Sequence, residues 1–270
     1  MDNIVKFAHL VNIIIHKMKR SFIFTAVCAS LLSVFSAKAQ TNLQILYDFG
    51  SDRQHVTTTF EGFYNDPWGN TYFFIDHDFD SRDRNGYVEA PSGSYMEIAR
   101  CLNFWQNSFL APVSLHVEYN GGVYKGYTIN NAFLAGVDFA LHSADYRYTL
   151  NIKALYKYIT YSDPDFYSQL PLQFTLVWGS RDLFGLKGLS FSGFADFWWE
   201  EHLLFYDRYG EMLPETSQIV FTAEPQLWYN VGDLFGCRNL NIGGEVELSY
   251  DFATTKGFRC RPCAGIKWVF

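Results

Sequence analysis

The sequence predicts an all-β fold, a transmembrane antiparallel β-barrel of about twelve strands that follows a cleavable signal peptide. Three observations predict it. Strand-length segments that alternate between apolar and polar residues recur along the chain. After residue 40 no segment approaches the roughly 18 to 20 uninterrupted apolar residues that a spanning helix needs, although 19% of all residues are aromatic. The last alternating segment ends on Phe270, an aromatic residue.

The N-terminal segment has the composition of an export signal. A basic stretch that ends at Arg20 precedes an apolar stretch from Phe22 to Phe35. Ala37-Lys38-Ala39 then places small residues at the two positions that a signal peptidase reads. We therefore expect export, with cleavage before Gln40. A complete signal also begins at Met18, so the true start is either Met1 or Met18.

Residues 1–39 are thus expected to be a leader and signal peptide, and residues 40–270 an outer-membrane β-barrel. A search for two-residue periodicity finds about twelve candidate strands in the barrel region. Most reach the roughly 9 to 11 residues that a tilted strand needs to cross a bilayer. They lie near residues 43–49, 55–64, 69–79, 94–105, 112–122, 132–142, 145–158, 169–179, 188–200, 218–230, 239–251 and 258–270.

The alternation gives most strands one apolar face and one polar face. In the segment 239–251, Ile242 and Leu248 alternate with Glu245 and Glu247. A charge on the lipid-facing side of a barrel costs roughly 2 to 4 kcal/mol at mid-bilayer. The carboxylates are therefore expected to point into the lumen and the apolar side chains toward lipid. The alternative is an exported soluble sandwich or lipocalin-like barrel, which would turn its apolar face inward.

One strand fits this alternation poorly. In the segment 94–105, Glu97 and Arg100 fall on opposite faces. A β-bulge between them would bring both charges to one face. The sequence thus suggests an irregularity there without placing it.

The connections alternate between short and long, which is typical of an even-stranded barrel whose chain ends both lie on the periplasmic side. Two of the expected periplasmic turns share the motif Asp-Leu-Phe-Gly, at 182–185 and 233–236, which we interpret as a reused turn. Other short connections are expected at 65–68, 106–111 and 143–145, and the longest at 80–93 and 201–217.

An acidic and aromatic segment at residues 60–79 carries a family resemblance. Its residues include Glu61, Phe63, Tyr64, Trp68, Tyr72, Phe73, Phe74, Ile75 and Asp76. With the signal peptide, the twelve strands and the terminal Phe270, this segment resembles the Tsx-type nucleoside-specific channels and related outer-membrane proteins from Bacteroidetes-like bacteria. The resemblance implies a monomeric, narrow, twelve-stranded channel that passes nucleosides.

The residues expected in the lumen suit such a solute. A nucleoside needs flat aromatic surfaces, worth roughly 1 to 3 kcal/mol per stacked base, and acceptors for its ribose hydroxyls. The alternative is that the aromatics form interfacial girdles and the charges support the wall. The candidate substrate-binding residues are Glu61, Phe63, Tyr72, Phe74, Asp76, Phe194, Asp196, Trp198, Glu224 and Trp228, faced across the lumen by Arg147 and Lys153.

Catalytic groups are present but do not form a convincing site. Ser114, His116 and Glu118 share one face of a strand. Residues two apart on a strand rarely reach the hydrogen bond of about 3 Å between a nucleophile and its base. We therefore expect no catalytic residues and no enzyme.

The cysteines suggest no metal site either. Cys260 and Cys263 lie three residues apart on a strand, so their thiols face opposite sides. Together with Cys101 and Cys237 they give the barrel four thiols, and a disulfide between any pair of them is open.

These observations predict a passive channel for small polar solutes, without cofactor or metal. Its expected partners are outer-membrane lipid, a small polar solute and, through the strand ending in Phe270, the barrel assembly machinery. A net charge of −7 argues against nucleic acid. Two alternatives remain: a closed structural or partner-binding barrel, and a lipid-modifying barrel enzyme.

Overall fold

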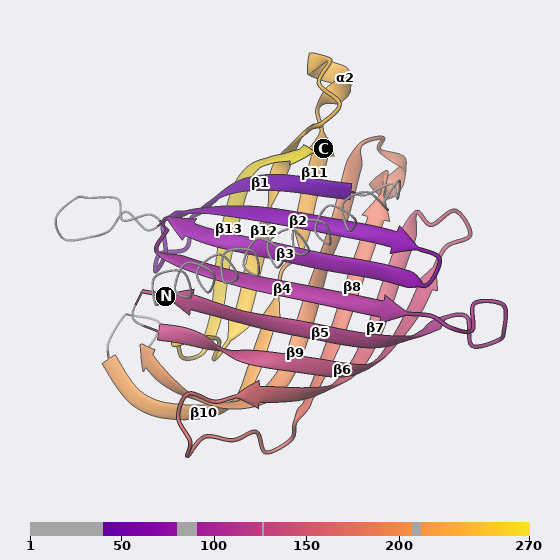
Figure 1. Cartoon of the computed structure of the whole chain (residues 1–270). Coiled ribbons are helices and arrows are strands. Elements are labelled where there is room, and N and C mark those ends of the chain that lie inside the picture. The colour runs from indigo at the N-terminus through magenta and orange to yellow at the C-terminus, as the bar shows by residue number, and fades with distance from the viewer. Residues whose placement is uncertain (1–39, 80–90, 126, 207–211) are drawn as a thin grey trace, which may run out of the picture. The chain divides into compact units, whose positions relative to one another are not determined.

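A computed structural model describes residues 40–79, 91–125, 127–206 and 212–270. The described residues form one antiparallel sheet of thirteen strands that closes on itself (Figure 1). β13 pairs with both β12 and β1, and this pairing completes the barrel. The strands are β1 (Gln40–Asp48), β2 (Val56–Asp66), β3 (Gly69–Phe79), β4 (Gly93–Leu102), β5 (Val113–Tyr124), β6 (Tyr127–His142), β7 (Tyr148–Thr160), β8 (Leu172–Arg181), β9 (Leu189–Tyr206), β10 (Met212–Ala223), β11 (Gln226–Asn230), β12 (Leu240–Tyr250) and β13 (Phe258–Val269).

The wall has twelve strand positions, because β10 and β11 share one of them. Both lie between β9 and β12. The break falls at Glu224 and Pro225, since proline has no N–H to donate to the ladder. Gly193 of β9 faces this break, and a Cβ there would approach the backbone oxygen of Glu224 to 2.3 Å. The predicted twelve-stranded barrel is confirmed, with the expected strand 218–230 divided in two.

Side chains alternate between the two faces of the wall as predicted. On β13, Ile266 is 46% exposed, whereas Arg261 is 3% exposed. On β12, Ile242 is exposed and Glu247 is buried against other inward side chains. The outer surface is thus apolar and the charges point into the barrel, the reverse of a soluble barrel.

The start of β1 and the end of β13 lie at the same end of the barrel, because Asn42 near the start of β1 pairs with Val269 at the end of β13. We name this the terminal end and the other the far end. The predicted short turns lie at the terminal end. The expected loop at 201–217 is wrong: β9 extends to Tyr206 and β10 begins at Met212. Within the two predicted long loops, residues 80–90 and 207–211 lie outside the described chain.

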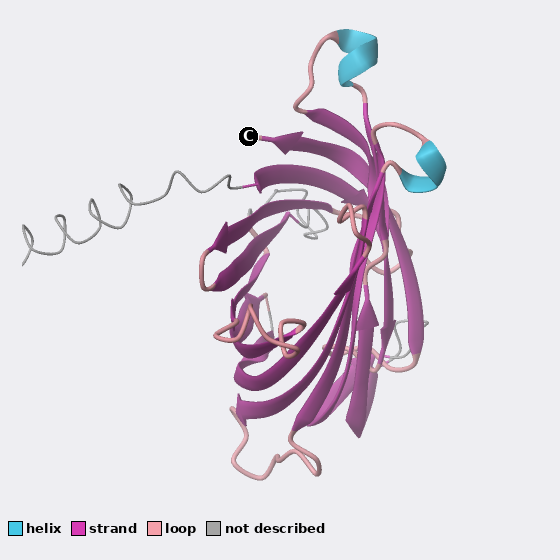
Figure 2. Cartoon of the chain, turned by 90° about the vertical axis from the view of Figure 1, so that its right-hand side faces the viewer, coloured by secondary structure: helices cyan, strands magenta, loops and turns pink. Residues whose placement is uncertain are grey.

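The repeated Asp-Leu-Phe-Gly motif forms a short helical turn each time. The first is the 3₁₀ turn η1 (Leu183–Gly185) and the second is α2 (Gly232–Phe235). Figure 2 places both at one end of the barrel. Gly185 has φ +79° and Gly236 has φ +69°, left-handed values that favour glycine and end a helical turn. The two copies differ in backbone, because Asp182 and Phe184 have φ +50° and +55° in the first, so reuse of one turn stays a prediction.

The β-bulge suggested near Glu97 and Arg100 is wrong. β4 pairs with β3 and β5 in unbroken register. Glu97 points inward, and Arg100 lies on the outer face near the terminal end. There the Arg100 guanidinium contacts Asp66, next to the β2–β3 turn, at 2.8 Å. The ion pair, rather than a bulge, accommodates the charge.

An aromatic belt flanks the outer face of β7. Tyr148 near one end of the strand and Tyr156 and Tyr158 near the other are exposed. Ile152 lies between them and is exposed on the same face. Aromatic residues at the two borders of an apolar band are typical of barrels that sit in a bilayer. Among the described residues, no helix is both long and apolar enough to cross a membrane.

Candidate functional site in the lumen

An aromatic and acidic group lines the lumen on β2 and β3. The hydroxyl of Tyr72 donates to Oε2 of Glu61 at 3.2 Å. The other oxygen of Glu61 accepts from Asn42 of β1 at 2.8 Å. The ring of Phe74 lies 6.0 Å from that of Tyr72, measured between centroids. These predicted lumen residues therefore come together, with the Glu61 carboxylate hydrogen-bonded on both sides.

The group continues toward the far end with Tyr95 and Glu97, which were not among the predicted lumen residues. Tyr95 of β4 packs against Phe74 at 5.8 Å between centroids and donates to Glu97 at 2.6 Å. Asp76 accepts from Thr59 at 2.5 Å. Tyr95 and Glu97 lie on the strand with ambiguous alternation, and only the register to Asp76 and Phe74 reveals that they point inward.

Phe63 lies at the terminal end of the same group. It stands opposite Tyr72 in the β2–β3 register, on the inward face, and is 38% exposed. Its exposure identifies it as a side chain at the mouth of the barrel.

A second group forms on β7, β8 and β9. Nζ of Lys157 lies 3.9 Å from the ring centroid of Trp198 and donates to Gln173 at 2.8 Å. The indole of Trp198 donates to Glu200 at 2.8 Å. The hydroxyl of Thr175 donates to Asp196. By register, Phe194 and Lys153 lie on the same inward face, opposite Val177 and Thr175 respectively.

A third group lies on β11, β12 and β13. The indole of Trp228 donates to Gln226 at 3.0 Å, and Gln226 donates to Glu245 at 2.8 Å. Nζ of Lys267 lies 4.4 Å from the centroid of Trp228. Glu224 precedes this group at the break between β10 and β11.

The predicted aromatics are more covered than a stacking site would suggest. Phe74, Trp198 and Trp228 are 7%, 6% and 1% exposed. Lysines lie over the faces of both tryptophans, a favourable cation–π arrangement. A solute that stacks on either indole would have to displace a lysine. The wall is therefore lined by paired groups, not by free ring faces.

Arg147 lies outside β7, at the terminal edge of the wall. It belongs to the β6–β7 turn, before β7 begins at Tyr148. Its side chain is 45% exposed and lies 3.5 Å from the carboxylate of Asp145. The preceding Tyr146 takes a positive φ of 53°, which turns the chain before the strand starts. The expectation that Arg147 faces the acids across the lumen is therefore wrong.

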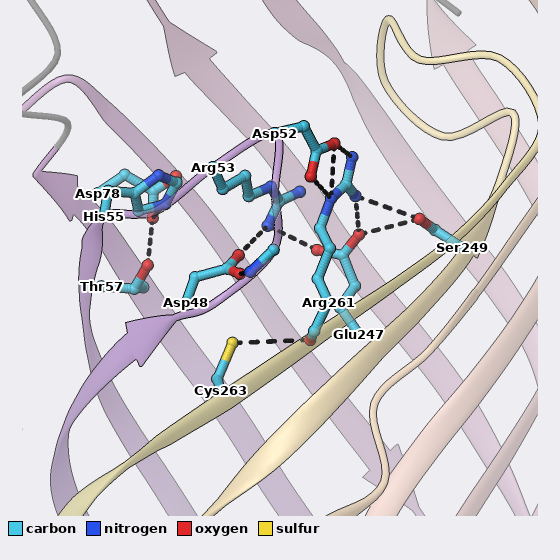
Figure 3. Close-up of polar contacts among 11 residues, drawn as sticks. Asp48, Asp52, Arg53, His55, Thr57, Asp78, Glu247, Ser249, Arg261 and Cys263 are labelled. Atoms are coloured by element: carbon cyan, nitrogen blue, oxygen red, sulfur yellow. Dashed lines mark hydrogen bonds and ion pairs between the residues drawn. The ribbon is translucent and has the colours of Figure 1, made fainter. Parts of the chain in front are cut away.

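An ion-pair network that the sequence did not indicate links the β1–β2 turn to the last two strands (Figure 3). The guanidinium of Arg53 lies 2.7 Å from Glu247 of β12 and 3.7 Å from Asp48. Arg261 of β13 contacts both Glu247 and Asp52, the latter at 2.7 Å. We name Asp48, Asp52, Arg53, Glu247 and Arg261 the turn network.

Burial and charge act in opposite directions on the turn residues of this network. Burial raises the pKa of the Asp52 carboxyl, but the hydrogen bond and charge of Arg261 outweigh it, and the pKa lies below its ordinary value. Burial lowers the pKa of Arg53, but the carboxylates of Glu247, Asp78 and Asp48 outweigh this effect, and the pKa lies above its ordinary value. Both groups are therefore charged at neutral pH, and the turn is held by charge-assisted bonds.

Beside the turn network, a smaller contact joins the start of β2 to β3. The hydroxyl of Thr57 donates to Asp78 at 2.7 Å, and Nε2 of His55 lies 3.5 Å from the same carboxylate (Figure 3). Asp78 thus holds the end of the β1–β2 turn against the neighbouring strand.

The cysteines and the polar triple on β5 are placed partly as predicted. Cys101, Cys237, Cys260 and Cys263 are free thiols. Cys260 is exposed outside the barrel and Cys263 lies on the inward face. His116 does contact Glu118, at 2.9 Å between Nε2 and Oε2, although the two are only two residues apart. Its other ring nitrogen, Nδ1, lies 3.3 Å from the sulfur of Cys101.

Comparison with solved structures finds barrels with low similarity. A KdgM porin aligns with 9% identity and a TM-score of 0.45, over 86% of this chain and 99% of that one. OccAB3 of Acinetobacter baumannii aligns with 10% identity and a TM-score of 0.37, over 87% and 99%. A BenF-like porin from Pseudomonas fluorescens Pf-5 aligns with 11% identity and a TM-score of 0.33, over 87% and 98%. TM-scores below 0.5 are too low to transfer a function.

The sequence itself gives one informative match. No curated protein matches the chain. A family model covers residues 39–270, which is the whole barrel and the residue before it. The chain therefore belongs to DUF5020, a family described as a domain of unknown function.

Proposed function

We propose that the protein is a passive, non-enzymatic outer-membrane channel for small polar solutes. The observation that carries the proposal is the inverted alternation of the closed wall. Apolar side chains such as Ile266 and Ile152 are exposed outside, whereas Glu247, Asp196 and Lys157 are buried inside. Such a wall suits lipid outside and water or a polar solute inside. Diffusion down a gradient requires no cofactor.

The location follows from the same argument. A closed β-barrel with an apolar exterior belongs to the outer membrane of a Gram-negative cell. Export by the segment 1–39 and recognition of the strand ending in Phe270 by the assembly machinery are parts of this proposal, as is a monomeric state.

Nucleosides are the proposed cargo. The support is the succession of aromatic rings and carboxylates along the inner wall, beginning at Phe63 near the terminal mouth and continuing through Tyr72, Glu61 and Phe74. An aromatic ring offers a sequence-tolerant stacking surface for a base, and a carboxylate accepts ribose hydroxyls. Because the deeper rings are covered, the exposed Phe63 is the proposed stacking contact, at the terminal mouth of the channel.

A liposome uptake assay tests both the proposed channel and its proposed preference for nucleosides. The refolded barrel is reconstituted, and uptake of uridine is compared with uptake of uracil and of ribose. Faster uptake of all three than in protein-free liposomes supports a channel, and a preference for uridine supports nucleoside specificity. Flux without preference would overturn the specificity alone. No flux from a folded, inserted barrel would overturn the channel.

A second candidate function is a closed barrel whose far-end connections bind a partner. The observation that favours it is that inward side chains are almost fully covered, Trp228 and Gln44 being 1% and 0% exposed. Single-channel recording separates the two, since a closed barrel gives no conductance steps. A channel gives steps that scale with salt concentration.

A further inference from the structure

Three side chains of different donor type meet on the lumen wall near the terminal end. Cys101 of β4, His116 of β5 and Asp138 of β6 bring a sulfur, a nitrogen and an oxygen atom within 4.8 Å of one another. The sulfur of Cys101 lies 3.3 Å from Nδ1 of His116 and 3.3 Å from Oδ2 of Asp138. All three side chains are buried. They lie outside the three aromatic groups described above.

The two separations from the sulfur are close to the edges of a tetrahedral zinc site, and the third, between His116 and Asp138, is within 4.8 Å. Zinc binds thiolate sulfur at about 2.3 Å and imidazole nitrogen or carboxylate oxygen at about 2.0 to 2.2 Å. Ligand atoms at tetrahedral angles are then roughly 3.3 to 3.6 Å apart. One ion can therefore contact all three atoms with small adjustments. Sulfur, imidazole and carboxylate together suit zinc better than the oxygen-preferring magnesium or calcium.

Neighbouring side chains hold the His116 and Asp138 atoms that point away from the proposed metal position. Oε2 of Glu118 lies 2.9 Å from Nε2 of His116. A carboxylate there keeps the proton on Nε2 and leaves the lone pair of Nδ1 pointing at Cys101 and Asp138. Asn151 of β7 donates to Oδ1 of Asp138 at 2.8 Å and fixes that carboxylate. Such outer partners are a regular part of metal sites.

We propose that Cys101, His116 and Asp138 bind one divalent transition-metal ion, with Zn²⁺ as the best fit and water as the fourth ligand. On binding, the Cys101 thiol releases its proton to solvent and its sulfur binds the metal as a thiolate. The two positive charges of the metal balance the thiolate and Asp138. Lys153, opposite Asp138 in the β6–β7 register, balances Glu118. The loaded site is thus neutral, as a buried site requires.

The test measures metal binding and not solute flux, so its outcome is independent of the proposed channel. The refolded full barrel is reduced, stripped with a chelator and titrated with Co²⁺, then with Zn²⁺. We expect one equivalent of Co²⁺, a thiolate-to-cobalt charge-transfer band and visible bands of a tetrahedral ion, all removed by Zn²⁺. Cys101→Ser should abolish the charge-transfer band, and Asp138→Asn should weaken binding at least about tenfold.

Two further variants keep the test decisive. Glu118→Gln should weaken binding about 10- to 100-fold while the charge-transfer band persists, because the change leaves all three ligands in place. Cys263→Ser, which removes another inward thiol, should bind cobalt as the unmodified chain does. Each variant is first shown to fold by its heat-dependent migration in gels. A folded barrel without a saturable band, or a band that survives Cys101→Ser, overturns the proposal. Alkylation of Cys101 without metal uptake would assign a reactive thiol instead.

Discussion

The guanidinium of Arg261 on β13 lies 2.7 Å from the carboxylate of Asp52 in the β1–β2 turn, although 209 residues separate them along the chain. The same guanidinium contacts Glu247 of β12. The first turn of the barrel is therefore tied to its last two strands at the seam where β1 closes on β13. The hydrogen-bonded ladder closes the wall, and the ion pairs hold the turn against it.

Replacing Arg261 with methionine should destabilise the barrel. The change leaves Glu247, which is 6% exposed, with Arg53 as its remaining cationic partner in the turn network. Breaking a buried ion pair by removing one partner costs about 3 to 5 kcal/mol. Because Arg53 stays, we expect the lower end of that range. Urea unfolding of the refolded barrel in detergent, followed by tryptophan fluorescence, measures the difference in the free energy of unfolding.

An exposed ion pair supplies the control. Lys256 contacts Glu215 in the far-end region, and the two side chains are 43% and 47% exposed. Lys256→Met should leave the free energy of unfolding almost unchanged, because solvent screens such a pair. Equal losses in Arg261→Met and Lys256→Met would show that the buried network has no special role.

The Asp52 contact should weaken in acid. The folded-state pKa of Asp52 lies below the ordinary value of 3.8, because Arg261 outweighs the effect of burial. A depressed folded-state pKa contributes stability above the unfolded-state pKa, and this stability is lost as the pH falls through the folded-state value. The stability gap between the unmodified barrel and Asp52→Asn should therefore be constant from pH 7 to pH 5 and shrink below about pH 4. Urea midpoints at several pH values check this. A gap that widens in acid would contradict it.

The alternation of the strands was predictable because it depends only on local sequence. A two-residue period assigns Ile242 and Glu247 to opposite faces of the strand. The period is pronounced because a charged side chain is destabilising on the lipid face but not in the lumen. Strand ends were less predictable. Glu201 and His202 were expected to begin a loop, but they extend β9, since a sheet can continue past an apolar band.

Contacts between distant strands were not predictable from one sequence. Cys101, His116 and Asp138 meet only because the β4–β5 register places Cys101 opposite His116 and the β5–β6 register places Asp138 diagonal to it. The turn network depends in the same way on the closure of β1 against β13. The position of Arg147 failed for a different reason: its alternation fits the strand, but the β6–β7 turn extends through it and β7 begins only at Tyr148.

A charge on the outer face should be costly where the lumen tolerates one. Ile152 of β7 is exposed outside, whereas its neighbour Lys153 points inward at the same depth. Ile152→Arg should lower the free energy of unfolding in lipid vesicles by about 2 to 4 kcal/mol. Lys153→Arg, which keeps a charge on the lumen side, should change it by less than about 1 kcal/mol. Similar losses for the two variants would contradict the assignment of the outer face to lipid.

The adjacent residues Trp198 and Trp199 of β9 give a matched pair for testing the channel. Trp198 points into the lumen beneath Lys157, whereas Trp199 packs outside against Phe197 at 4.8 Å between centroids. Trp198→Ala should raise single-channel conductance, because it removes a large inward side chain. Trp199→Ala should leave the conductance unchanged, since it alters only the outer surface. An equal response in the two variants would mean that the inner wall does not line the path of the solute.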